Sequence, residues 1–124
     1  MNIKEYKKHG ISVVEIIEDG VIISDAQDFL DLVSDVSAKR IIVKKENVCG
    51  EFYDLHTGVA GDILQKVSNY RLFFGIVGDF SDIKSNSFRD FIYESNNTKQ
   101  ILFKKTVEEI VKIFCRPRIE EDED

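Results

Sequence analysis

The chain has 124 residues, of which 43% are hydrophobic, and this size and composition suit one domain with a single core. It holds no apolar run long enough to cross a membrane and no signal-peptide pattern at its start, so we expect a cytoplasmic protein without a membrane partner. Five of the 23 acidic side chains lie in residues 120–124, which leaves 18 acidic against 17 basic residues elsewhere and argues against a nucleic-acid partner. We expect a folded domain over residues 1–118 and a solvated, disordered acidic tail over residues 119–124.

The beginning of the chain predicts a pair of antiparallel strands. Residues 3–8 and 11–17 are rich in strand-forming side chains, and His9 and Gly10 between them suit a tight turn. The first strand carries lysines, which discourage pairing with other chains, so we place it at the edge of the sheet.

A helix is predicted next. Ser24 and Gln27 form a capping-box pattern that would begin it. Its apolar side chains recur on one face, and three carboxylates lie on the opposite face, at Asp28, Asp31 and Asp35. We interpret these carboxylates as a solvated face and not as a metal site, because side chains that radiate from one helix cannot close around an ion.

The middle of the chain contains a strand, an irregular segment and a second helix. Residues 41–43 predict a short buried strand, and residues 46–57 form the least regular segment. We expect Thr57 to cap the helix that follows. Gly58 and Gly61 lie close together at its start, which suggests that another backbone or a ligand approaches there.

Residues 72–77 form an apolar run typical of a central strand that is buried on both faces. In α/β domains, ligands and partners usually meet the loops at the carboxyl ends of the parallel strands. The loop after this strand contains Asp79 and Ser81, so we expect both residues on such a surface.

The last part of the chain repeats the helix–strand alternation. A helix is predicted from Ser85 or Ser87 to the pair that ends at Asn97, because asparagine tolerates the left-handed conformation of helix ends. Residues 100–103 predict a last strand, and Thr106 opens the capping box of a final helix. The whole order predicts a single small α/β domain, in which an N-terminal antiparallel strand pair precedes alternating helices and parallel strands with right-handed crossovers.

Residues that would carry catalysis are sparse. Cys49 and Cys115 are far apart and in no metal-binding spacing, so we expect neither a disulfide nor a metal site. His56 is the only histidine near the candidate site, and neither a nucleophile motif nor a Gly-rich phosphate loop accompanies it. We therefore expect no cofactor and favour a protein that is not an enzyme.

Several runs resemble the bacterial domain of unknown function 4180 family across nearly the whole body of the chain. The runs are Phe52-Tyr53-Asp54-Leu55 with Thr57-Gly58, Gly61 with Ile63-Leu64-Gln65-Lys66, Asn69-Tyr70-Arg71, and Val77-Gly78-Asp79-Phe80-Ser81 with Arg89-Asp90-Phe91-Ile92-Tyr93-Glu94-Ser95-Asn96. The resemblance implies no particular function.

The order of elements is also similar to that of STAS domains, the modules of anti-sigma factor antagonists and sulfate transporter tails. Asp54, Thr57 and Gly58 occupy the place where those domains carry an Asp, a phosphorylated hydroxyl and a Gly. The spacing departs from the STAS pattern, since two residues separate Asp54 from Thr57 and no second hydroxyl stands beside Thr57. The resemblance implies a regulatory module with Thr57 as a possible phosphorylation site, whereas the capping preference of threonine favours a purely structural role.

Our first hypothesis is a non-enzymatic regulatory or protein-interaction module. Its partner or ligand surface would contain eight residues, namely Asp54, Thr57, Gly58, Gly61, Asp79, Ser81, Arg89 and Asn96. The partner would be another protein, and the chain itself would be a monomer or a homodimer. Phe52 and Tyr53 would be exposed enough to cover a dimer contact.

The alternative hypothesis is a small anionic-ligand-binding protein or enzyme that uses the carboxyl edge of the sheet. The pairs Lys44-Lys45 and Lys104-Lys105 end two strands, and together with Arg89 they would gather an anion. Solvated strand ends explain the same lysines. Arg89 also has a structural alternative, an ion pair with Asp79 that fixes the loop.

Overall fold

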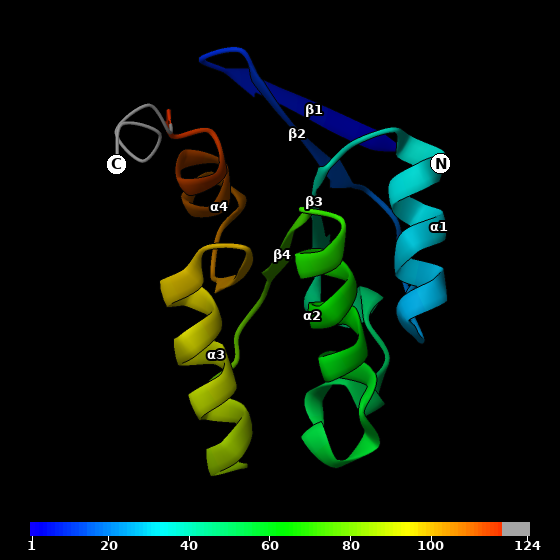
Figure 1. The fold of residues 1–124 in the computed structure, drawn as a ribbon, viewed down its shortest axis with the longest axis vertical. Helices are drawn as coiled ribbons and strands as arrows, with labels where there is room; N and C mark the ends of the chain where they lie inside the picture. Colours follow the sequence, from blue (N-terminus) through cyan, green and yellow to red (C-terminus); the bar gives the residue numbers. More distant parts are fainter. Residues whose placement is uncertain (118–124) are drawn as a thin grey trace.

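Five strands form one sheet in which each strand pairs with the next strand of the chain (Figure 1). The computed structural model describes residues 1–117. The strands are β1 (Ile3–Lys8), β2 (Ile11–Ile16), β3 (Arg40–Lys44), β4 (Phe73–Val77) and β5 (Ile101–Lys104). β1 is antiparallel to β2, and all later pairs are parallel. The predicted α/β class and the N-terminal antiparallel pair are therefore confirmed, while the predicted acidic tail over residues 119–124 lies outside the described residues.

Four helices cover the two faces of the sheet. They are α1 (Ala26–Val36), α2 (Val59–Asn69), α3 (Asn86–Thr98) and α4 (Val107–Phe114). The first three share one apolar core on one face, as successive right-handed crossovers in one direction require, and α4 forms a smaller core on the other face. Figure 1 shows α1 and α2 on one side of the sheet and α4 on the other. No helix among residues 1–117 is both long and apolar enough to span a membrane.

The central strands are buried on both faces because their side chains alternate between the two cores. Ile41 and Val43 of β3 belong to the larger core, and Ile42 between them belongs to the core under α4. Gly75 lies beside Ile42 in β4. A Cβ atom on Gly75 would come within 2.7 Å of Ile110 Cγ2, so the missing side chain is what allows α4 to lie close to the sheet.

The buried side chain of Asn47 ties the segment after β2 to the end of β3. It is 0% exposed, its Nδ2 donates to Glu18 O (3.0 Å) and Gly20 O (2.8 Å), and its Oδ1 accepts from Lys44 N (2.8 Å). All of its hydrogen-bonding groups thus find backbone partners, as a buried amide requires. These bonds hold the long connection from β2 to α1 against the sheet.

The two edge strands of the sheet, β1 and β5, differ in how their outward backbone groups are covered. The side chain of Asn96 on α3 accepts from Phe103 N (2.8 Å) and donates to Phe103 O (3.3 Å), so the outward backbone groups of Phe103 in β5 are already paired. β1 has no such cover, and five of its six residues are exposed. The turn between β1 and β2 has positive φ at both His9 (55°) and Gly10 (76°), the geometry of a type I′ hairpin turn.

Three predicted helix boundaries are wrong. α1 is capped by Asp25, which accepts from Asp28 N (2.8 Å), and not by Ser24. α3 begins after Ser85, the first of the two predicted starts, and it runs past Asn97 to end where Lys99 takes the left-handed conformation. The cap of α2, described below, is the third.

Candidate functional site

The carboxyl ends of the parallel strands and the N-terminal ends of α1, α2 and α3 lie at one end of the molecule, which is the lower end in Figure 1. Three loops form this surface, which we call the carboxyl edge: residues 45–58, 78–85 and 105–106. The first of them is not an extended loop. It folds into three short 3₁₀ turns, Lys45–Asn47, Gly50–Tyr53 and Leu55–Thr57.

Lys45 joins the first loop to the second. Its Nζ donates to Asp79 O (2.8 Å) and to the Asp82 carboxylate (2.7 Å). A Cβ atom on Gly78 would come within 2.7 Å of Lys45 Cβ, so the glycine makes room for this crossing. Lys45 is thus occupied by its own chain, and neighbouring Lys44 pairs with Asp19 at 3.3 Å.

An aromatic cluster lies beneath the carboxyl edge and connects the first two loops to α3 and β5. Phe52 contacts Phe88 at a ring-centroid distance of 6.0 Å, and Tyr53 contacts Phe80 at 6.4 Å. Phe80 in turn stands edge-on to Phe103 at 5.3 Å. Because Phe52 is 0% exposed and Tyr53 is partly buried, the prediction that this pair forms an exposed dimer contact is wrong. Phe52 and Tyr53 instead pack against the core, and these contacts fix the loop of residues 45–58.

Thr57 uses its hydroxyl within its own loop. Oγ1 lies 2.7 Å from Glu51 O and 2.8 Å from Asp54 O, and it accepts from Val59 N at 3.3 Å. The N-cap of α2 is Gly58 and not Thr57, since Gly58 has a φ of 84° and directly precedes the helix. Glycine is needed at this position because other residues rarely adopt such a φ.

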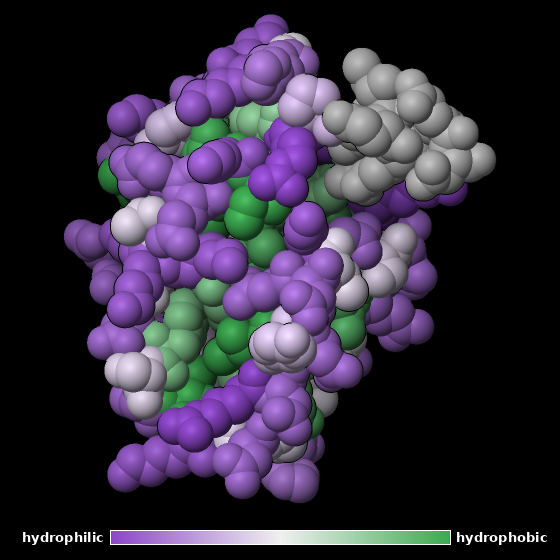
Figure 2. Space-filling model, turned by 90° about the vertical axis from the view of Figure 1, so that its left-hand side faces the viewer, coloured by the Kyte–Doolittle hydropathy of each residue, from purple (hydrophilic) through white to green (hydrophobic). Residues whose placement is uncertain are grey.

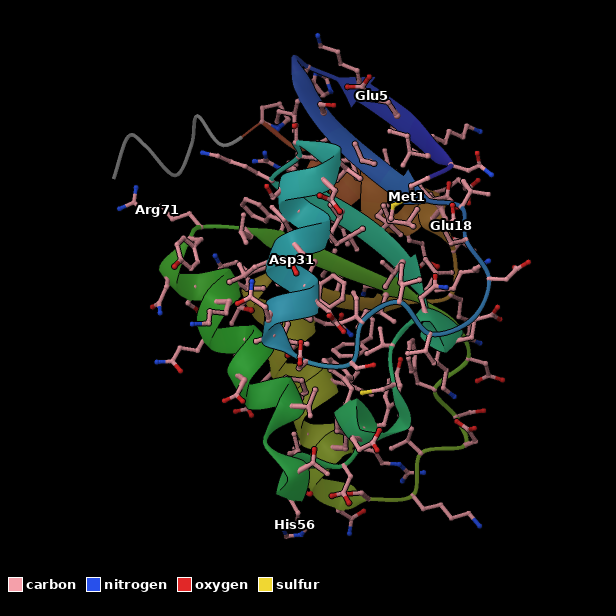
Figure 3. The ribbon with its side chains drawn as sticks, turned by 90° about the vertical axis from the view of Figure 1, so that its right-hand side faces the viewer. Met1, Glu5, Glu18, Asp31, His56 and Arg71 are labelled. Atoms are coloured by element: carbon pink, nitrogen blue, oxygen red, sulfur yellow. The ribbon has the colours of Figure 1, made fainter. Side chains whose placement is uncertain are left out.

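Three residues near Thr57 are exposed, namely Asp54, His56 and Gly61. The Asp54 carboxylate accepts from His56 N (3.0 Å), which shapes the turn, and Figure 3 shows His56 at the far end of the molecule. Gly61 has no atom within 4 Å of the position that a Cβ would take. Its lack of a side chain therefore serves no packing contact within the described chain.

The second loop contains Asp79 and Ser81, and α3 supplies Arg89. The Asp79 carboxylate accepts from Ser81 N (2.9 Å), and the hydrogen bonds from Ser81 lower the pKa of Asp79. The Nε of Arg89 donates to Ile83 O (2.9 Å). Among residues 1–117 no ion pair joins Arg89 to Asp79, so the predicted ion pair between them is wrong. Arg89 does fix the loop, by its hydrogen bond to the backbone carbonyl of Ile83.

The eight predicted site residues thus fall into two groups. Seven lie on the carboxyl edge or at the start of the helices that border it. Asn96 instead lies near the end of α3, where its side chain pairs with the backbone of β5.

Two hollows open at the carboxyl edge. The larger, of about 700 Å³, lies between the ends of β3 and β4, and its charged lining consists of Lys44, Lys45, Glu46, Asp79 and Asp82. Carboxylates outnumber lysines there, and Lys45 is already bonded, so this hollow does not gather an anion. It does not support the ligand site that the sequence suggested for Lys44-Lys45.

The smaller hollow, of about 300 Å³, has the opposite character. Arg89, Lys104 and Lys105 line it together with the apolar side chains of Phe80, Ile92 and Phe103. None of the described residues that line it is acidic. On the side of the molecule that carries α3 and α4, hydrophobic residues show at the surface between hydrophilic ones (Figure 2). This hollow suits a group that combines negative charge with an apolar part.

The thiols offer little chemistry. Cys49 and Cys115 are both free and buried, and burial raises the pKa of the Cys49 thiol. Within residues 1–117, no three His, Cys, Asp or Glu side chains are grouped as a metal site would require.

Sequence reasoning missed the features that hold the carboxyl edge in place. The ion pair of Lys45 with Asp82 and the contact of Phe52 with Phe88 each join residues more than 30 positions apart, and no local pattern signals such contacts. No curated protein matches the chain significantly. The family model described as "Domain of unknown function (DUF4180)" matches residues 8–113. The chain therefore belongs to the DUF4180 family.

Proposed function

We propose that this protein is a non-enzymatic regulatory or protein-interaction module that contacts its partner through the carboxyl edge. The observation that carries the proposal is the fixing of two of the three loops, residues 45–58 and 78–85, on one aromatic cluster, with Lys45 as a second link between them. A surface that is already ordered pays little entropy on binding, which is what a docking site requires.

The proposed surface extends from Asp54, Thr57, Gly58 and Gly61 across the loop of Asp79 and Ser81 to Arg89. At its basic end, Arg89, Lys104 and Lys105 surround an apolar floor. A partner that places an acidic side chain and an apolar neighbour there would satisfy both kinds of lining. The charge of the hollow thus favours an acidic segment of the partner.

A charge-reversal experiment tests this proposal. Affinity capture from the native cell, quantified by mass spectrometry, compares the wild type with the variant Lys104→Glu/Lys105→Glu. The matched control, Lys39→Glu/Lys112→Glu, reverses two exposed lysines that lie away from the carboxyl edge. We expect the first variant to lose specific proteins that the control retains. If the wild type and both variants captured the same proteins in equal amounts, the proposal would be refuted.

The second candidate function is binding of a small anionic ligand in the smaller hollow, and the same three basic side chains favour it. Thermal-shift measurements with inorganic phosphate and with nucleoside monophosphates test this candidate. A saturable stabilisation that Arg89→Gln abolishes would support a ligand site, because a ligand that binds only the folded state raises its stability. Absence of any shift at millimolar probe would exclude these ligands.

Regulation through Thr57 is a separate part of the proposal and rests on the resemblance to STAS domains. A phosphate at Thr57 would add a charge of about −1.5 to −2. It would also remove the hydroxyl hydrogen that Thr57 donates to the carbonyl groups of Glu51 and Asp54. Such a change would rearrange the proposed surface. Intact-mass analysis of protein from the native cell, grown under many conditions, tests it: only unmodified chain would rule the switch out.

A further inference from the structure

The backbone N–H of Lys105 points away from the sheet at the border of the smaller hollow. Lys104 O accepts from Gly78 N (3.0 Å), so this carbonyl points toward the end of β4. Because a trans peptide is planar, a carbonyl and the N–H of the next residue point in opposite directions, and the N–H of Lys105 therefore points outward from β5. No hydrogen bond within residues 1–117 engages this N–H. The hollow that Lys105 lines thus has an unused backbone donor beside it.

Arg89 lies across the hollow from this donor. The side chain of Asn96 on α3 bonds to Phe103 N and O, which places the helix along the outer edge of β5. The helix runs antiparallel to the strand, as a crossover helix in a parallel sheet does. Arg89 lies two turns before Asn96, about 10 Å nearer the carboxyl edge. Lys105 lies two residues after Phe103, about 7 Å nearer the same edge, and the space between Arg89 and Lys105 is the hollow that both residues line.

The guanidinium of Arg89 is oriented by its own chain but keeps free donors. Its Nε donates to Ile83 O (2.9 Å), whereas its two terminal amino groups form no hydrogen bond within residues 1–117. Two amino groups of one guanidinium can bind a carboxylate through parallel hydrogen bonds. Lys104 and Lys105 add positive charge, and neither forms an ion pair within the described chain. The hollow therefore offers a backbone N–H and a guanidinium, two kinds of donor that bind a carboxylate.

The rest of the lining and the size of the hollow restrict what carries the carboxylate. The floor is apolar and consists of Phe80, Ile92 and Phe103, and the volume of about 300 Å³ is at the lower end for ligand pockets. The negative charge and the apolar group of the occupant must therefore lie close together. The last residue of a polypeptide meets this condition, because its carboxylate and its side chain are attached to the same Cα. An acidic side chain within a chain would instead bring two flanking peptide groups that need partners of their own.

We propose that the smaller hollow binds the C-terminal residue of a partner protein, and that the side chain of this residue is apolar. Its carboxylate would accept from Lys105 N and from the amino groups of Arg89, and its side chain would cover Phe80 and Ile92. Capture of a terminal carboxylate by backbone amides is a recurring mode of peptide recognition. The inference rests on the proposed function, since it names the part of the partner that meets the basic end of the carboxyl edge.

An NMR titration of the isotope-labelled full chain tests this inference at the amide of Lys105. The probes are tetrapeptides that end in Leu, Ile or Phe, each made with a free carboxylate and with an amidated terminus. We expect the peptides with a free carboxylate to shift the Lys105 amide signal until it saturates. The amidated forms should bind at least about tenfold more weakly, because the hydrogen bonds to the charged group are lost.

A pair of matched variants locates the binding. Lys104→Gln/Lys105→Gln keeps the backbone amide as the reporter and should weaken binding of the peptides with a free carboxylate. Lys39→Gln/Lys112→Gln changes two exposed lysines away from the carboxyl edge and should leave binding unchanged. Equal effects of the two variants would overturn the inference.

The probes themselves give the other decisive outcomes. Equal binding of free and amidated peptides would overturn the inference, as would an unchanged Lys105 signal at millimolar peptide. Acetate that binds as tightly as the peptides would also overturn it, because the apolar floor would then contribute nothing. None of these results bears on the proposed function, which the capture experiment tests separately.

Discussion

Replacement of Asn47 by Ala should strongly destabilise the fold, because this side chain holds the end of β3 to the segment after β2. The side chain is 0% exposed and its three hydrogen bonds serve the backbone of Lys44, Glu18 and Gly20. Each buried group left without a partner costs about 1–3 kcal/mol. Because Gly20 is exposed and water can reach its carbonyl, we expect a total loss of about 2–4 kcal/mol.

Urea unfolding followed by far-ultraviolet circular dichroism measures this loss. The midpoint should fall while the slope stays unchanged, and the melting temperature should drop by about 8–16 °C, at about 4 °C per kcal/mol for a chain of this size. Glu46→Ala is the control, since Glu46 is the exposed neighbour and should be nearly neutral. A loss below about 1 kcal/mol for Asn47→Ala would refute the structural role assigned to these bonds.

Asn47→Asp separates hydrogen bonding from shape. An ionised carboxyl at this position cannot donate to Glu18 O and Gly20 O, so burial would raise its folded-state pKa above the unfolded value of about 3.9. A raised pKa contributes stability below the unfolded pKa that is lost as pH rises toward the folded pKa. The variant should therefore be closest to wild type near about pH 4 and weakest at neutral pH. A pH-independent difference would contradict this reasoning.

Three further predictions concern the sheet. Gly75→Ala should cost about 1–3 kcal/mol by overpacking, and Ile110→Ala should cost less in that background than alone, measured by a double-mutant cycle. Asn96→Ala should cost about 1–2 kcal/mol in urea unfolding because two β5 backbone bonds are lost, whereas exposed Asn97→Ala should cost little; equal effects would contradict the pairing. Burial and a strand carboxylate raise the pKa of Tyr6 from 10.0 to about 12, so wild type should lose stability as pH rises through that window. Tyr6→Phe should lose less, measured by urea unfolding at about pH 9 and about pH 11.

The sequence predicts the elements of this fold because each has a local cause. Apolar runs such as residues 72–77 can be satisfied only in the middle of a sheet, and the helices repeat apolar side chains on one face. Helix ends were less predictable because several polar residues compete for each cap. Ser24 and Asp25 are adjacent, and only the backbone path decides that Asp25 accepts the first-turn bond.

The location of the candidate site could be predicted from the sequence, but the side-chain contacts that hold it together could not. The loops at the carboxyl ends follow from the strand order, so Asp79 and Ser81 lie where expected. Whether a lysine of the carboxyl edge forms an ion pair depends on residues that are distant in the sequence. Lys45 pairs with Asp82, which is 37 residues away, whereas Lys105 forms no ion pair within residues 1–117. Side chains that bond to backbone across such separations leave no periodic trace in the sequence, which is why Asn47 was also missed.

The sequential order of the strands bears on how the chain reaches its fold. Every strand pairs with the strand before it in the chain, and no later strand is inserted between two earlier ones. The sheet can therefore grow by accretion from the β1–β2 hairpin as each helix–strand unit leaves the ribosome, without reopening pairs already formed. Since such short loop closures cost little entropy, this topology should fold faster than a doubly wound domain of equal length.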